Sequence, residues 1–195
     1  LMISLDNPDI DALTVVRRVN GSAINLNVVA KVNDISRRFY KGQISLEEAF
    51  YQIKHIDRQL YPWWLKDICT VLVVIFFTGM FGGGWQDMVF TGIVGLCLAG
   101  WFHIVKRIGL NSLIRDLLSS VLISVLAAFL VRFNPQLHLN LIITGSIMLL
   151  VPGAIITNAI RDTLHGDYAA GNAKILEAFV KAAMIALGVY AGLLI

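Results

Sequence analysis

The sequence predicts an all-α polytopic membrane protein, with about five transmembrane helices preceded by a small α+β cytosolic segment. Of its 195 residues, 57% are hydrophobic, compared with about 45–50% in an ordinary soluble domain. Residues 1–64 carry eight basic and seven acidic residues. Residues 65–195 carry only eight basic and six acidic residues over 131 positions, so charged residues are about half as frequent there. We therefore expect two domains: the end of a truncated α+β domain over 1–62 and a transmembrane domain over 63–195.

A β-hairpin is expected at the start of the chain. Short apolar runs with β-branched residues cover 1–5 and 12–19, and residues 6–9 between them read Asp-Asn-Pro-Asp. That combination favours a turn. Because a two-stranded hairpin is marginal alone, we expect further chain to pair with it.

Two helices are expected next. Apolar residues at helical spacing over 26–40 predict the first helix, with Gly42 as its stop signal. Ser45 and Glu48 have the spacing of a capping box, which opens a second helix reaching about Arg58.

Five apolar runs follow, each close to the roughly 20 residues that a bilayer core requires. Their expected bounds are 65–81, 86–104, 112–131, 138–160 and 172–195. Trp63 and Trp64 stand before the first run, as in an interfacial aromatic belt. The glycines at 82–84 predict a tight turn, with a re-entrant element as the alternative.

Loop charges predict the orientation. The N-terminal segment and the loop with Lys106 and Arg107 are basic, as is the loop that contains Arg161. The loop at 82–87 has no Lys or Arg, and the loop at 132–138 has one. The positive-inside rule then gives a multi-pass inner-membrane protein with a cytosolic N-terminus and an external C-terminus.

The fourth run contains the strongest candidate for a binding site. Pro152-Gly153 interrupts it, since proline lacks the backbone N–H and clashes with the preceding turn. The half-helix that starts there would direct its positive dipole end toward a substrate carboxylate. A simple packing kink is the alternative. The predicted substrate-binding residues are Pro152, Gly153, Thr157, Asn158, Arg161 and Asp162.

The fifth run carries charges on one helical face. Lys174, Glu177 and Lys181 are spaced by three and four residues. Charges inside a span are costly and often mark ion paths, so Glu177 and Lys181 are predicted to couple transport to protons. A structural ion pair is the alternative. Gly188 and Gly192 predict close helix packing.

Other chemistries find no support in the sequence. The four histidines share no ligand spacing, and Cys69 and Cys97 lie within apolar runs. We expect no metal, no cofactor and no disulfide framework. The sequence has neither a nucleotide-binding P-loop nor a nucleophile–base pair, so we expect no enzyme. No nucleic-acid partner is expected.

A series of motifs runs through almost the whole chain in a fixed order. They are Tyr61-Pro62-Trp63, Phe81-Gly82-Gly83-Gly84-Trp85, Gly109-Leu110-Asn111, Leu150-Val151-Pro152-Gly153, Thr157-Asn158-Ala159-Ile160-Arg161-Asp162, Gly166-Asp167 with Gly171, and Glu177-Ala178. Their order and spacing resemble the threonine/serine exporter (ThrE) family. Within it, the chain is similar to the larger component of a split exporter.

The resemblance implies export of small polar, carboxylate-bearing metabolites, either threonine and serine or succinate-type dicarboxylates. We expect an ion or proton gradient to drive it. A split exporter implies a smaller four-span membrane subunit as partner, and a homo-oligomer is possible. A non-transporting scaffold or regulatory subunit, acting through the cytosolic segment, is the alternative. Lys181 departs from the apolar or small residue expected there, which puts its role in doubt.

Overall fold

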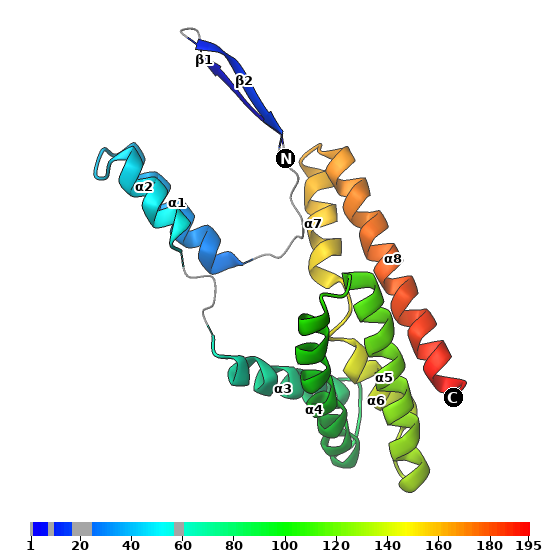
Figure 1. The fold of residues 1–195 in the computed structure, drawn as a ribbon. Helices are drawn as coiled ribbons and strands as arrows, with labels where there is room; N and C mark the ends of the chain where they lie inside the picture. The colour runs from blue at the N-terminus through cyan, green and yellow to red at the C-terminus, as the bar shows by residue number, and fades with distance from the viewer. Residues whose placement is uncertain (1, 8–9, 17–24, 57–60) are drawn as a thin grey trace. The chain divides into compact units, whose positions relative to one another are not determined.

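The computed structural model describes residues 2–7, 10–16, 25–56 and 61–195. The chain divides into two compact units, Leu1–Tyr61 and Pro62–Ile195 (Figure 1). The first unit contains a hairpin and two helices, and the second contains six helices among the described residues.

The predicted hairpin is confirmed. Strand β1 (Met2–Asn7) pairs antiparallel with β2 (Ile10–Val16), and Ile3 lies opposite Val15 in the register. The predicted second strand extended to residue 19, and residues 17–19 lie outside the described part of the chain.

Both predicted soluble helices form, but the second ends at Lys54 and not at about Arg58, which lies outside the described residues. Helix α1 (Leu26–Tyr40) ends before Gly42, whose φ of 68° is a left-handed conformation that favours glycine. Helix α2 (Leu46–Lys54) begins at Ser45, where Oγ accepts a hydrogen bond from the Glu48 N–H at 3.1 Å. Their contact buries Ile35, Ile44 and Ala49.

The assignment of the hairpin and these helices to one α+β domain is not supported. Among the described residues, the strands pair with each other, and α1 packs on α2. No comparable packing joins the strands to either helix in the part of the chain that the structure describes. The hairpin is too small to form a sheet core of its own.

The second unit is a membrane helix bundle. Four of its helices are long and apolar enough to cross a bilayer: α3 (Trp63–Met80), α4 (Trp85–Ile108), α5 (Ser112–Phe133) and α8 (Tyr168–Leu193). At 1.5 Å rise per residue, they measure roughly 27 to 39 Å, which matches a hydrocarbon core of about 30 Å.

The predicted fourth span is the exception. It consists of two short helices, α6 (Leu139–Ile147) and α7 (Gly153–Leu164), so four helices of the described residues, and not five, are individually long enough to cross a bilayer. The predicted interruption is confirmed. The Gly153 N–H bonds to the Val151 carbonyl at 2.9 Å, across a link where Pro152 can offer no N–H of its own.

The glycine segment after α3 is a tight turn, as predicted, and not a re-entrant element. Gly82 has φ 92°, and the Gly83 N–H bonds to the Thr78 carbonyl at 2.9 Å, so the chain reverses at once into α4. A Cβ on Gly83 would lie 2.8 Å from the Thr78 carbonyl oxygen, which excludes a larger residue there.

Helix α8 packs on two different helices along its length (Figure 1). Gly171 lies against α7, where the Ala159 carbonyl is close. Further along, Gly188 meets Leu117 and Ser120 of α5, and Gly192 meets the next turn of α5. The predicted close packing at these glycines is confirmed. Since both contacts advance together along α5, the two helices run parallel.

Candidate functional site

A cavity of about 650 Å³ lies where the α4–α5 turn meets the α6–α7 link. The α4–α5 turn and the α6–α7 link both contribute apolar residues to the lining, so the charged side chains in it stand out. The charged lining residues are Lys106, Arg115, Asp116 and Lys181. Three cations thus surround one carboxylate, and an anion is the ligand that such a cavity favours.

Asp116 is the buried carboxylate of this cavity. It stands in the first turns of α5 and is only 2% exposed. The Arg115 guanidinium donates two hydrogen bonds to the same oxygen, Oδ1, from Nε at 2.9 Å and from Nη2 at 2.8 Å. Arg115 itself is 42% exposed at its side chain, so the pair joins a buried anion to an accessible cation.

The other cations come from different helices. Lys106 is near the end of α4, one residue before Arg107, and Lys181 is in the middle of α8. Lys181 is the more buried partner of its ion pair, with 14% side-chain exposure against 50% for Glu177, at an Nζ–Oε1 distance of 3.1 Å. Its position in the lining gives Lys181 access to a bound anion.

The broken span contributes its predicted feature. Pro152, Ala154 and Ile155, which form the start of α7, line the cavity. The positive end of the α7 dipole therefore adjoins the three cations. A helix start of this kind adds to the attraction for an anion. The charged residues that share its cavity favour a binding site over the alternative of a simple packing kink, because a kink does not require them.

The other predicted substrate residues lie outside the cavity lining. Thr157 is exposed and donates from Oγ1 to the Gly153 carbonyl at 3.0 Å. Asn158 is half-buried, Arg161 is exposed, and Asp162 pairs with Lys174 of α8. Of the predicted site residues, Pro152 and Lys181 thus share the lining of this cavity, whereas the four polar residues lie further along α7 and outside it.

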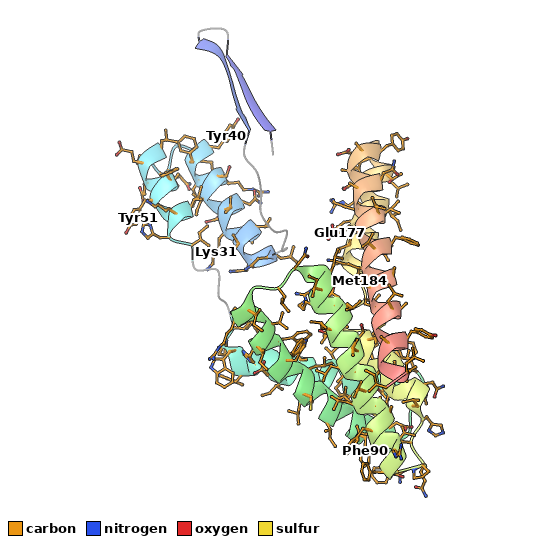
Figure 2. The ribbon with its side chains drawn as sticks, turned by 45° about the vertical axis from the view of Figure 1, so that its right-hand side comes forward. Lys31, Tyr40, Tyr51, Phe90, Glu177 and Met184 are labelled. Carbon is orange, nitrogen blue, oxygen red and sulfur yellow. The ribbon has the colours of Figure 1, made fainter. Side chains whose placement is uncertain are left out.

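Glu177 lies outside the lining of the main cavity and borders a second hollow that includes Asn111 and Ser112, at the very start of α5. Figure 2 shows Glu177 on α8, nearer the start of that helix than Met184. Gly188 faces residues 117 and 120 of α5, so the part of α8 before about residue 180 extends beyond that start. Glu177 is therefore near the end of the bundle, and the prediction that it couples protons remains a prediction.

Arg115 and Asp116 were missed by the sequence analysis. Charged residues in the first turn of a span normally reach the interface, so Arg115 and Asp116 did not by themselves indicate a site. Their spacing with later residues could have done so, because Asp116, Ser120 and Ser124 are four residues apart and all three are buried. Polar residues on one face of an apolar span indicate a protein-facing surface.

A second buried carboxylate, also missed, joins two loops at the other end of α4. Asp87 is 2% exposed. It accepts hydrogen bonds from the Gly84 N–H at 3.0 Å and the His138 N–H at 2.8 Å, and His138 Nδ1 lies 3.0 Å from its Oδ2. Asp87 therefore ties the α3–α4 turn to the loop between α5 and α6.

Comparisons with known proteins agree with this architecture. The family model described as "Putative threonine/serine exporter" (ThrE) matches residues 1–195. An uncharacterized protein of Schizosaccharomyces pombe is 26% identical over 88% of this chain and 22% of its own length. Pheromone-regulated membrane protein 10 of Pichia sorbitophila is 26% identical over 87% of this chain and 18% of that protein, and its Eremothecium gossypii counterpart is 25% identical over 87% and 24%. No solved structure matches.

The long apolar helices and the family match define a multi-pass membrane protein of transporter type. The chain belongs to the threonine/serine exporter (ThrE) family, as the sequence motifs predicted. It spans about a fifth of the length of the curated relatives it matches.

Proposed function

We propose that this chain is an exporter subunit that binds small polar, carboxylate-bearing metabolites in the cavity beside Pro152. Threonine and serine, or succinate-type dicarboxylates, are the proposed substrates. The observation that carries the proposal is the meeting of Lys106, Arg115 and Lys181 with the start of α7 around one cavity. An Arg fork can hold both oxygens of a carboxylate, and a Lys can act as a point charge on a second group.

The proposed setting is the inner membrane with a cytosolic N-terminus. The cavity is then at the cytosolic end of the bundle, because the basic α4–α5 turn lines it. An ion or proton gradient drives export, with Glu177 and Lys181 as the sequence-predicted coupling pair. Thr157, Asn158, Arg161 and Asp162 are proposed to contact substrate at an earlier stage of export, because α7 runs from the cavity toward the loop assigned to the cytosol.

A smaller four-span membrane subunit is the proposed partner, with a homo-oligomer as the alternative source of the remaining pathway. The curated relatives are four to five times longer than this chain, which supports a larger working assembly. A scaffold or regulatory role through the first unit is the competing proposal. It predicts no binding of small carboxylates by the membrane unit.

Counterflow in proteoliposomes tests the proposal. Proteoliposomes that contain the chain, with or without the small subunit, are loaded with unlabelled succinate, threonine or serine. Entry of the same compound, labelled and added outside, into the proteoliposomes is then followed. Lys181→Met should reduce counterflow at least tenfold. Lys66→Met is the control, because Lys66 lies on α3, outside the cavity lining. Equal loss in both variants would argue against this cavity as the binding site, whereas no counterflow with any partner would favour the scaffold.

A further inference from the structure

A separate pocket of about 360 Å³ lies where the start of α3 meets the end of α4. Its lining residues are Trp63, His103, Ile104, Lys106 and Arg107. Both helices are long enough to cross a bilayer, so a pocket at their ends lies at the level where the hydrocarbon core meets water. This interfacial pocket is therefore within reach of lipid headgroups as well as of solutes.

The charges in the interfacial pocket are cationic. Lys106 and Arg107 are both exposed, and neither belongs to an ion pair within the part of the chain that the structure describes. The acid nearby is Asp67 of α3, which is outside the lining and lies with Oδ2 at 3.0 Å and Oδ1 at 3.1 Å from His103 Nε2. An anion in the pocket would thus meet two free cations and no acidic lining residue.

The remaining walls are apolar and exposed. The Trp63 side chain is 69% exposed and Ile104 is 51% exposed. Trp63 stands edge-on to His103, with ring centroids 5.9 Å apart and an interplanar angle of 79°. Through His103, the same ring contact continues to Asp67, so residues of α3 and α4 hold the two sides of the pocket in place before any ligand binds.

We propose that the interfacial pocket binds the headgroup of an anionic phospholipid. The phosphodiester lies between Lys106 and Arg107, and the first carbons of an acyl chain cover Trp63 and Ile104. A soluble phosphate could use the two cations, but it would leave the exposed apolar wall uncovered, whereas a phospholipid satisfies both. Basic pockets between membrane helices are suited to anionic headgroups. A zwitterionic lipid offers the same phosphate, but its choline group finds no acidic partner in the lining.

Lipid binding by the purified full chain tests the proposal, and it requires no transport activity. Native mass spectrometry in a neutral detergent counts each bound lipid by its mass. The wild type should bind phosphatidylglycerol more tightly than phosphatidylcholine. Arg107→Gln should weaken phosphatidylglycerol binding about fivefold, the effect of one cation beside an anionic lipid. Lys106 is less suitable for substitution because it also lines the main cavity.

Two matched controls come from the opposite end of the bundle. Arg132 is exposed in the last turn of α5, as Arg107 is in the last turn of α4, so Arg132→Gln should keep the wild-type affinity. Trp63→Ala should also weaken phosphatidylglycerol binding, whereas Trp85→Ala should not, although Trp85 is the first residue of α4 as Trp63 is of α3. This second pair keeps the test decisive if Arg107→Gln fails to fold.

The opposite results are equally specific. Equal affinity of the wild type for the two lipids, or equal loss in Arg107→Gln and Arg132→Gln, would overturn the proposal. An excess of glycerophosphoglycerol, the same headgroup without acyl chains, should leave phosphatidylglycerol bound. If it displaces the lipid at equal concentration, the pocket is a site for soluble phosphodiesters and the lipid assignment is wrong.

Discussion

The contact between α5 and α8 depends on glycine, and replacing Gly188 by alanine should separate the two helices. A Cβ at Gly188 would lie 2.5 Å from the Leu117 carbonyl oxygen and 2.1 Å from Ser120 Oγ. Ordinary van der Waals contact begins at 3.4 Å, so the backbone contact alone is about 0.9 Å too short. Ser120 can turn away, but the carbonyl cannot.

The expected cost can be estimated from these distances. Overpacking of this size costs about 1–3 kcal/mol, because helices must shift and lose contacts elsewhere. Alanine also gains about 1 kcal/mol over glycine in helix propensity, which hides part of the loss. Gly100→Ala is therefore the matched control: Gly100 is in the middle of α4, and nothing lies within 4 Å of its added Cβ.

The free energy of unfolding of both variants should be measured in lipid bicelles by steric trapping. The propensity gain is common to both, so the difference between them isolates the overpacking, expected at about 1–3 kcal/mol. Gly188→Ala combined with Ser120→Ala should recover only part of the loss, because the Leu117 carbonyl remains. Equal stability of Gly188→Ala and Gly100→Ala would show that the helices are not in this contact.

Three further predictions concern the rest of the bundle. Asp87→Ala should cost about 2–5 kcal/mol in thermal unfolding measurements, since it leaves the His138 N–H without its buried acceptor. Asp87→Asn should cost less, because the amide keeps one accepting oxygen, and equal costs would show that the contact requires the carboxylate charge and not only an acceptor. Pro152→Ala should join α6 to α7 and reduce counterflow at unchanged membrane insertion, and unaltered transport would assign the break to packing alone. After replacement of both native cysteines, an impermeant maleimide added outside should label a cysteine at the exposed Gly84, where an added Cβ meets only Asp87 Oδ2 at 3.8 Å, but not one at Lys106. The reverse pattern would invert the proposed orientation.

The features that the sequence predicted correctly depend on neighbours along the chain. Ser45 caps α2 through the N–H of Glu48, three residues away. Pro152 breaks the fourth span because its own ring prevents a helical hydrogen bond. Gly188 and Gly192 are one helical turn apart, so their shared face follows from the period of the helix.

The features that were missed depend on which helices meet. Asp116 lines a cavity together with residues of the α6–α7 link and of α8, and the polar stripe within α5 indicates a protein-facing side without showing which elements cover it. Asp87 is buried by a loop that arrives 51 residues later. The extent of the break at Pro152 has a related cause, because the sequence shows the proline but not whether it bends the helix or divides it into two.

The division of that span explains why the cavity is where it is. Helix α6 packs on α3, α4 and α5, whereas α7 packs extensively on α8 alone among the described helices. The link at 148–152 is thus where the chain passes from the helices around α6 to the α7–α8 pair, and the cavity lining takes residues from both sides of it. Helix α8 is nevertheless held against α5 at Gly188 and Gly192. A carboxylate in the proposed site would therefore contact Arg115 and Lys181 on two helices that are packed together. The start of α7 is then the part of the cavity wall whose helix packs extensively on α8 alone, so a change in the affinity of the proposed site is expected to come from α7.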